Sequence, residues 1–188
     1  MGRRAIFLDR DGTINEEMDY LSSAEDFRLL PRTAAAVRLL RGHGLLVIVV
    51  TNQSGVARGY FTEEDVAAIH ERMRRDLARA RTRVDAVYSC LHHPDDGCAC
   101  RKPGTLLFQQ AAQDLCLDLS ASYFVGDKLS DILPGQSLGG GTILVLTGYG
   151  QQEQELARQQ DFQPDYIADD LYSAAEWIIR RNEGTVRL

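Results

Sequence analysis

The sequence lacks the features that mark membrane, secreted and repetitive proteins. No apolar run approaches the roughly 20 residues that a membrane-spanning helix needs. No charged, apolar and small-residue series of the kind that forms a secretion signal opens the chain, so we expect a cytoplasmic location. Internal repeats and low-complexity linkers are also missing, and 188 residues are most simply organised as one domain over residues 1–188.

An excess of positive charge is missing as well. The chain carries 21 Lys and Arg against 27 Asp and Glu, which gives a net charge of -6. Because binding to nucleic acid requires a basic surface, we expect no nucleic-acid partner. One stretch with helical spacing is locally basic, and we interpret it as a solvated helix face with local ion pairs. Its arginines are Arg72, Arg74, Arg75, Arg79, Arg81 and Arg83.

The chain does contain a regular alternation of strand-like and helix-like segments. Runs rich in strand-forming residues occur at 5–8, 45–50, 84–90, 122–125, 142–146 and 166–168. The first helical pattern starts near 31–33 and stops at 42–44. Further helical patterns occupy 62–81, 105–117, 129–137, a stretch from about 152, and 171–181. We expect Pro134 and Gly135 to bend or end the fourth of these helices. This alternation, joined by right-handed crossovers, predicts an α/β fold: a three-layer αβα, Rossmann-like sandwich with a central, mostly parallel sheet.

The first apolar run leads directly into two aspartates, Asp9 and Asp11, which are separated by one residue. In an extended segment, residues two apart point to the same side, so both carboxylates can converge on one ligand. Open α/β sheets place their active sites at the carboxyl ends of strands. Two carboxylates at this spacing suit Mg²⁺ with phosphate chemistry, since Mg²⁺ prefers oxygen ligands and leaves room for substrate oxygens.

Polar side chains also follow the later strands. Thr51 and Asn52 follow the second run, Arg101 and Lys102 lie in the loop after the third, and Asp127 follows the fourth. The ordered series DRDGT, VVTNQSG, CRKP and VGDKLSD resembles the four motifs of the haloacid dehalogenase-like phosphatases. This resemblance covers most of the chain and implies the fold and the chemistry of that family.

The resemblance implies a role for each motif residue. Asp9 is the expected nucleophile, because an ionised carboxylate can attack phosphorus and form an aspartyl-phosphate. Asp11 is the expected general acid and base, and it must hold a proton at one moment, which requires surroundings that favour its neutral form. Thr51 and Lys102 are expected to stabilise the transferring phosphoryl group.

The same resemblance implies a catalytic Mg²⁺. Its expected ligands are the Asp9 carboxylate, the Asp11 backbone carbonyl and Asp127. The position of Asp131 leaves alternatives open. It can act on the metal through water or through Lys102, or it can simply lie on the polar face of its helix.

Cysteine and histidine cluster ahead of the third motif. Cys90, His92, Cys98 and Cys100 supply ligands in pairs two apart, a spacing that can close a tetrahedral zinc site. Four protein ligands leave no position for water, so we expect this Zn²⁺ to be structural. His93 is the alternative to His92, and a disulfide between Cys90 and Cys98 is the alternative to zinc.

The expected zinc-binding loop (about 90–103) ends with the two cations Arg101 and Lys102. This arrangement resembles that of one subgroup of the family, the D-glycero-D-manno-heptose 1,7-bisphosphate 7-phosphatases and the related histidinol-phosphatase domains. That similarity implies a capless enzyme whose specificity comes from loops. Arg101 is expected to recognise the sugar or its second phosphate, since a guanidinium pairs well with phosphate. The implied substrate contacts are Glu17, Met18, Asp19, Tyr20, Asn52, Gln53, Ser54, Arg101 and Lys128.

The expected activity is Mg²⁺-dependent hydrolysis of the 7-phosphate of D-glycero-D-manno-heptose 1,7-bisphosphate to heptose 1-phosphate, by a monomer that serves nucleotide-activated heptose biosynthesis. Histidinol phosphate is the nearest alternative substrate, and the preferred heptose anomer stays open. A polynucleotide 3'-phosphatase and a non-catalytic, zinc-stabilised binding module are more distant alternatives. The acidic net charge disfavours the first, and the intact catalytic set disfavours the second.

Overall fold

A parallel sheet forms the centre of the molecule. The computed structural model describes residues 2–185. The strands are β1 (Ala5–Leu8), β2 (Leu46–Asn52), β3 (Ala86–Cys90), β4 (Tyr123–Gly126), β5 (Gly141–Val145) and β6 (Tyr166–Ala168). They form one six-stranded sheet in the order β3-β2-β1-β4-β5-β6, and every neighbouring pair is parallel.

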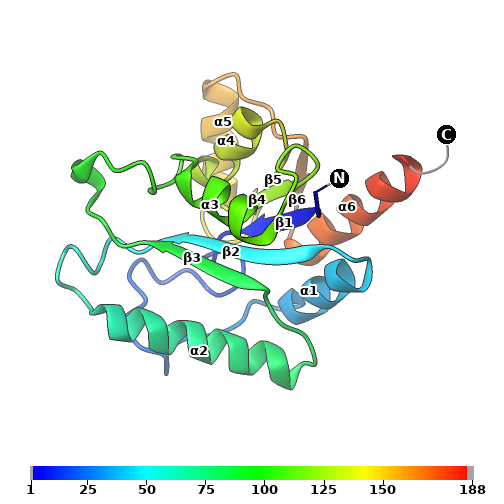
Figure 1. Ribbon diagram of the computed structural model, residues 1–188. Helices are drawn as coiled ribbons and strands as arrows, with labels where there is room; N and C mark the ends of the chain where they lie inside the picture. Colours follow the sequence, from blue (N-terminus) through cyan, green and yellow to red (C-terminus); the bar gives the residue numbers. More distant parts are fainter. Residues whose placement is uncertain (1, 186–188) are drawn as a thin grey trace.

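Helices cover both faces of this sheet (Figure 1). They are α1 (Thr33–Gly42), α2 (Glu63–Arg79), α3 (Leu106–Leu115), α4 (Leu129–Leu138), α5 (Gly150–Gln159) and α6 (Leu171–Thr185), with a short 3-10 helix, η1, at Pro94–Asp96. The helices α1, α2 and α6 pack on one face, and α3, α4 and α5 pack on the other. The predicted three-layer αβα fold is confirmed. Among residues 2–185, no helix is both long enough and apolar enough to span a membrane.

The two faces of β1 show how the sheet divides the core. Ile6 and Leu8 pack toward α1, α2 and α6, whereas Phe7 packs toward α3. The Phe7 ring meets Phe108 edge-on at a centroid distance of 5.2 Å and stacks on Phe124 at 5.0 Å. Burial of one such side chain stabilises the fold by about 1.5–3 kcal/mol. Because β1 is buried on both faces, its sequence is apolar without alternation.

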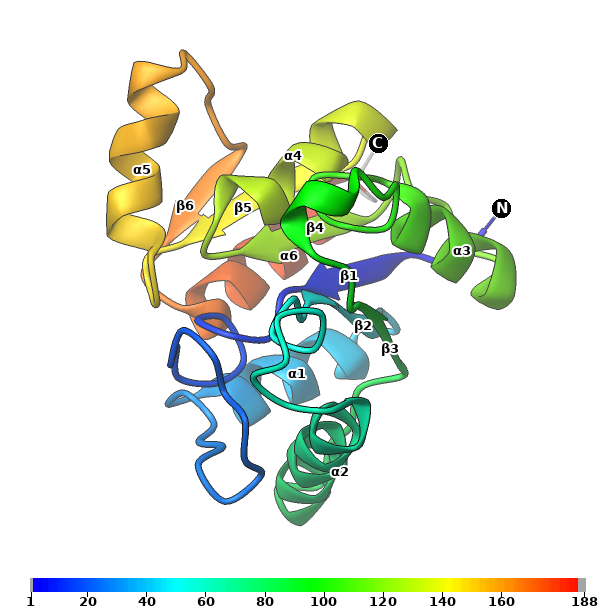
Figure 2. The same cartoon turned by 90° about the vertical axis from the view of Figure 1, so that its left-hand side faces the viewer.

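The strand order places the carboxyl end of β1 between those of β2 and β4. The chain runs from β1 to β2 and β3 on one side, and then crosses to β4 on the other side. In open α/β sheets, ligands bind at such a switch point, in the crevice outside the carboxyl ends of the strands. Figure 2 shows the loops that follow β1 and β2 on the same side of the molecule. The fold therefore gathers the residues that follow β1, β2 and β4.

Several elements begin or end one or two residues away from their predicted bounds, and two of the differences have a clear structural reason. β2 runs two residues past its predicted end, through Asn52, because its last residues pair with β3. α4 continues through Pro134 and ends at Leu138. Gly135 lets this helix lie against β4, since a Cβ at that position would be 2.8 Å from the Phe124 ring. Packing against the sheet thus outweighs the local preference of proline.

α2 lies along the edge of the fold and carries the arginine-rich stretch. A capping box fixes its start: Thr62 Oγ1 accepts from the Asp65 N–H at 3.2 Å, and the Asp65 carboxylate accepts from the Thr62 N–H at 2.8 Å. Asp76 pairs with Arg72 at 2.7 Å and with Arg79 at 3.1 Å. These contacts agree with the predicted helix face that carries local ion pairs.

Candidate active site

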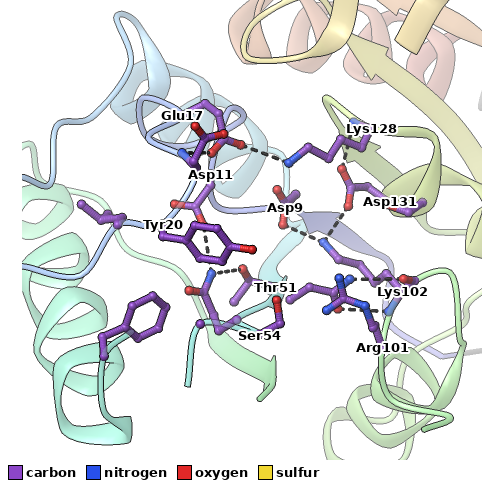
Figure 3. Close-up of a pocket in the computed structure, with 17 residues that line it drawn as sticks. Asp9, Asp11, Glu17, Tyr20, Thr51, Ser54, Arg101, Lys102, Lys128 and Asp131 are labelled. Atoms are coloured by element: carbon purple, nitrogen blue, oxygen red, sulfur yellow. Dashed lines mark hydrogen bonds and ion pairs between the residues drawn. The ribbon is translucent and has the colours of Figure 1, made fainter. Parts of the chain in front are cut away.

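A cavity of about 200 Å³ opens where β1, β2 and β4 end (Figure 3). Most of the predicted catalytic and substrate-binding residues line it: Asp9, Asp11, Glu17, Asp19, Tyr20, Thr51, Asn52, Gln53, Ser54, Arg101, Lys102 and Lys128. Two predicted residues are not part of its wall. Met18 is 48% exposed and faces a neighbouring hollow, whereas Asp127 is fully buried.

Lys102 forms the buried positive centre of this site. Its Nζ lies 2.6 Å from Asp9 Oδ1 and 2.8 Å from Asp131 Oδ1, and it also donates to the Val50 carbonyl at 2.6 Å. Burial alone would lower the pKa of Lys102, but the Asp131 and Asp9 carboxylates outweigh burial and raise it. The ammonium group is therefore charged and is shared by two carboxylates. Asp131 is buried on this contact and does not lie on a solvated helix face.

Three carboxylates crowd together around Asp9. Asp9, Asp127 and Asp131 each offer an oxygen within 4.8 Å of the others. Burial, followed by the Asp131 charge, raises the pKa of Asp9 to about 7 and that of Asp127 to about 8. In the part of the chain that the structure describes, Asp127 Oδ2 accepts from the Tyr149 N–H at 2.9 Å, while Oδ1 is buried without a hydrogen-bond partner. A set of clustered oxygen donors with one unpartnered atom fits a divalent cation such as Mg²⁺.

A glycine keeps the loop after β1 close to this cluster. Gly12 has a φ of 79°, in the left-handed region that glycine adopts readily. A Cβ at Gly12 would lie 2.2 Å from Asp127 Oδ2. The glycine of the DRDGT motif therefore lets the first loop approach the carboxylate that follows β4.

Asp11 sits in the opposite kind of surroundings. Its carboxylate accepts hydrogen bonds from Asn15 Nδ2 at 2.9 Å, Gln53 Nε2 at 2.9 Å and Arg10 Nη2 at 2.8 Å. Burial by itself raises the pKa of Asp11, but Arg10, Asn15 and Gln53 together lower it below its usual value. These protein groups thus favour the ionised carboxylate, which differs from the neutral form expected from the sequence.

Gln53 links the end of β2 to Asp11. Its Nε2 donates to Thr51 Oγ1 at 2.8 Å as well as to Asp11, and its side chain is 4% exposed. Thr51 is 1% exposed and lines the cavity. Gln53, which the sequence analysis assigns to substrate contact, thus also joins two catalytic candidates.

Asn52 holds the loop that carries Lys102. Its Oδ1 accepts from the Lys102 N–H at 3.1 Å, and its Nδ2 donates to the Lys102 carbonyl at 3.2 Å. These two bonds fix the backbone amide and carbonyl groups of Lys102. The preceding Arg101 lines the cavity, and its buried Nη1 has no hydrogen-bond partner in the described part of the chain. An unpaired guanidinium nitrogen here is suited to an anionic group of the ligand.

The predicted cysteine and histidine cluster forms at the end of β3. Donor atoms of Cys90, His92, Cys98 and Cys100 all lie within 4.8 Å of one another. The Sγ atoms are 3.0 to 3.6 Å apart, and His92 Nδ1 is 3.1 Å from Cys100 Sγ. A zinc tetrahedron with Zn–S bonds of about 2.3 Å has edges of about 3.8 Å, so the donor set fits this ion.

The alternatives to this ligand set find no support. His93 Nδ1 accepts from the Asp95 N–H at 3.3 Å and caps η1. The Cys90 and Cys98 sulfurs, 3.6 Å apart, are well beyond the disulfide length of about 2.05 Å. His92 is therefore the histidine of the cluster.

Comparison with known proteins decides the family. A family model described as HAD-hydrolase-like matches residues 99–174. A D-glycero-D-manno-heptose-1,7-bisphosphate 7-phosphatase from Thermosynechococcus vestitus is 44% identical over an alignment of 189 positions. The alignment covers 95% of this chain and 96% of that protein. The chain belongs to this heptose-bisphosphate phosphatase family. A D-glycero-beta-D-manno-heptose-1,7-bisphosphate 7-phosphatase from Haemophilus ducreyi is 42% identical over 156 residues, or 79% of this chain and 86% of that protein.

Solved structures of heptose-bisphosphate phosphatases share the fold. The crystal structure of a D,D-heptose 1,7-bisphosphate phosphatase from B. bronchiseptica, complexed with magnesium and phosphate, matches with a TM-score of 0.87 and 36% identity over 95% of this chain and 99% of that chain. The enzyme from Burkholderia thailandensis matches with a TM-score of 0.73 and 30% identity over 94% of this chain and 99% of that chain. The family resemblance predicted from the four motifs is confirmed.

In this member of the heptose-bisphosphate phosphatase family, the loop after β1 is tied to loops on both sides of the cavity. Glu17 pairs with Lys128 Nζ at 3.1 Å, and the Tyr20 ring meets Tyr60 edge-on at a centroid distance of 4.8 Å. Burial lowers the pKa of Lys128, but Glu17 and Asp127 outweigh it and raise the pKa above its usual value. Figure 3 shows Tyr20 and Glu17 on the same side of the cavity, across from Arg101.

Sequence reasoning missed part of the cavity wall and one residue behind it. Leu21, Gly55, Phe61 and Ser130 also line the cavity. Gly55 is required because Phe61 lies over it, so that a Cβ would be 2.2 Å from the ring. Arg10 is fully buried next to Asp11. The sequence does contain a signal for Arg10, which is a charged residue directly after a buried apolar run. A charge in such a position needs a partner, and Asp11 is next to it.

Proposed function

We propose that the chain is a Mg²⁺-dependent phosphatase that converts D-glycero-D-manno-heptose 1,7-bisphosphate to heptose 1-phosphate. The observation that carries this proposal is the buried Asp9 carboxylate held 2.6 Å from Lys102 Nζ in a polar cavity. Relatives that are 44% and 42% identical bear the name of this activity, which supports the choice of substrate. The proposed product feeds nucleotide-activated heptose biosynthesis.

Asp9 attacks the 7-phosphorus in the first step, and the bond from phosphorus to the sugar oxygen breaks as the aspartyl-phosphate forms. Lys102 and Thr51 hold the phosphoryl oxygens as charge redistributes over them. Asp9, the Asp11 backbone carbonyl and Asp127 would hold Mg²⁺, which supplies positive charge beside those oxygens. Asp131 acts through Lys102, whose ammonium group it pairs with at 2.8 Å.

Asp11 moves the proton in both steps. Its carboxyl group donates a proton to the departing sugar oxygen, and the resulting carboxylate then takes a proton from the water that attacks the aspartyl-phosphate. The second step releases phosphate and restores Asp9. Although Arg10, Asn15 and Gln53 lower the pKa of Asp11, a phosphate dianion placed beside the carboxylate opposes that shift. The substrate thus supplies the condition under which Asp11 holds its proton.

The loops around the cavity are the proposed substrate contacts. Arg101 is assigned to the second phosphate, because its buried and unpartnered Nη1 needs an acceptor. Glu17, Tyr20 and Ser54 line the cavity where the sugar would lie, and Lys128 adds a cation on the same wall. Asp19, Asn52 and Gln53 complete the lining, while Met18 is assigned to the outer rim.

We further propose that Cys90, His92, Cys98 and Cys100 hold one structural Zn²⁺. The donor separations support this, and four protein ligands leave no open position for chemistry. The ion would order the loop that ends at Lys102, because metal binding contributes free energy to the folding of its site. A monomer stays our proposal for assembly. A cytoplasmic location also stays our proposal, and it is supported by a ligand set that requires reduced thiols.

The test of the proposed function is catalytic efficiency with Mg²⁺ on both anomers of the heptose bisphosphate and on histidinol phosphate. We expect a clear preference for one heptose anomer and a loss of at least about a thousandfold in Asp9→Asn, with the fold retained. A preference for histidinol phosphate would overturn the substrate. Turnover by Asp9→Asn at the wild-type rate would overturn the mechanism.

A further inference from the structure

Arg10 joins the active site to a helix that otherwise contributes nothing to the cavity. Its side chain is 0% exposed, and its guanidinium donates to Asp11 Oδ1 at 3.0 Å and to Oδ2 at 2.8 Å through Nη2. On its other side, Nη1 lies 3.3 Å from Nε2 of His70, which belongs to α2 and is 7% exposed. A guanidinium has only donors, so His70 Nε2 accepts this bond and the ring carries its proton on Nδ1.

The surroundings of His70 keep its ring in that accepting state. Burial, followed by the charges of Arg10 and Arg74, lowers the pKa of His70 to about 3. The ring is therefore neutral at neutral pH, and a neutral imidazole has one lone pair that can accept a hydrogen bond. The lone pair meets the one side of the Arg10 guanidinium that does not face Asp11.

We propose that His70 is a positioning residue for the phosphatase reaction: by accepting a hydrogen bond from Arg10, it holds the guanidinium against the Asp11 carboxyl group and keeps that group directed at the departing oxygen. The proposal rests on the role of Asp11 in the proposed function. Asn15 and Gln53 hold the same carboxylate from two loops, and Arg10 with His70 holds it from α2. Asp11 is thereby fixed from three separate parts of the chain.

Loss of the acceptor would affect Asp11 through Arg10. Without His70 Nε2, the buried Nη1 lacks a partner, and a buried unsatisfied donor is costly enough for the guanidinium to move toward another acceptor. Movement of the guanidinium displaces the carboxylate that it binds at two oxygens. A misplacement of about 1 Å in a proton-transfer group can lower the rate by up to about a hundredfold.

Two variants at one position separate the hydrogen bond from the packing of the ring. His70→Phe keeps a ring of similar size without the acceptor, whereas His70→Gln places an amide oxygen near the position of Nε2. We expect His70→Phe to lower kcat between about tenfold and a hundredfold with KM changed less than about twofold, and His70→Gln to stay within about threefold of wild type. Equal losses in both variants, or a loss carried by KM, would overturn the proposal.

A double-mutant cycle with Arg10→Lys tests whether His70 acts through Arg10. If it does, His70→Phe lowers kcat by less than about twofold in the Arg10→Lys background, because the contact is already gone. A full, additive loss in that background would show that His70 acts in another way. Melting curves of each variant identify any that fail to fold. If His70→Phe or Arg10→Lys fails to fold, the kcat of His70→Gln tests the proposal, and a loss larger than about threefold contradicts it.

The substrate assignment is kept separate from this test. All variants are compared on heptose bisphosphate and on phenyl phosphate, whose leaving group also needs a proton. If the wild type hydrolyses phenyl phosphate but not heptose bisphosphate, the heptose assignment is overturned. The relative kcat values of the His70 variants on phenyl phosphate would still test the positioning role. Wild-type turnover of neither ester would overturn the proposed function and the positioning role together.

Discussion

His70 is expected to make the stability of the protein depend on pH between about pH 6.5 and about pH 3. Its pKa is lowered to about 3 in the folded protein, whereas an unperturbed histidine has a pKa of about 6.5. Between these values the unfolded chain binds a proton at this residue that the folded chain does not bind. Protons therefore favour unfolding, and the contribution that is present above about pH 6.5 is lost as the pH falls.

The magnitude follows from the two pKa values. At about pH 5 the unfolded histidine is mostly protonated and the folded one is almost entirely neutral, so the free energy of unfolding falls by about 2 kcal/mol relative to neutral pH. The ring is 7% exposed, which leaves little solvent to screen the charge of Arg10. Gln at position 70 does not titrate, and His70→Gln should lack this part of the pH dependence.

Urea unfolding of wild type and His70→Gln at about pH 7 and about pH 5 measures the effect. The measured quantity is the pH-induced change in the free energy of unfolding of the wild type minus that of His70→Gln, because groups common to both proteins, such as the Cys90, His92, Cys98 and Cys100 cluster, cancel in that difference. We expect a difference of about 2 kcal/mol, with the wild type losing more. Equal losses in both proteins would refute the reasoning, since they would show that His70 titrates normally in the folded state.

Two further predictions concern the buried lysine and the metal-like cluster. Lys102→Met should lower the free energy of unfolding by about 3–5 kcal/mol, because it leaves the buried Asp9 and Asp131 carboxylates without their cation. The Lys128 side chain is 37% exposed, so Lys128→Met should lower the free energy of unfolding by only about 1 kcal/mol or less. Denaturant titration checks both, and a loss in Lys102→Met no larger than in Lys128→Met contradicts the buried pairing of Lys102 with Asp9. Metal analysis should find about one zinc per chain, and a chelator should lower the melting temperature. Cys98→Ser should reproduce that decrease while Cys116→Ser, at an exposed cysteine outside the cluster, should not; a zinc content near zero argues against the site.

The fold and the floor of the site follow from local patterns. Apolar runs without alternation predict strands that are buried on both faces, and the carboxyl ends of parallel strands must meet at one edge. For this reason the sequence predicts that Asp9, Thr51 and Asp127 lie together, whereas the place of Lys102, 12 residues past the end of β3, is predicted only by the family resemblance. The zinc-like cluster was equally predictable, since its ligands lie within 11 residues of sequence.

The contacts that cross the fold could not be predicted in this way. Arg10 and His70 are 60 residues apart, and their contact depends on how α2 is rotated against the sheet. The alternation of a strand directs Arg10 away from Asp9, but no local rule brings its guanidinium back to Asp11. Pro134 shows the same limit, because packing of α4 on β4 overrides the preference of the residue.

The two aspartates of the first motif are distinguished by the buried cation that each one faces. Lys102 is shared between Asp9 and Asp131, so it only partly offsets burial, and the pKa of Asp9 rises to about 7. Arg10 binds both oxygens of Asp11 and is not shared with a second carboxylate among the described residues, and the pKa of the Asp11 carboxyl group falls. Taken without ligands, this order would make Asp9 the acid. The proposed Mg²⁺ would favour the ionised form of Asp9, and a phosphate dianion beside Asp11 would favour its neutral form, so binding of both would reverse the order. We therefore expect Asp9 and Asp11 to take up the proposed roles of nucleophile and acid when metal and substrate are both bound.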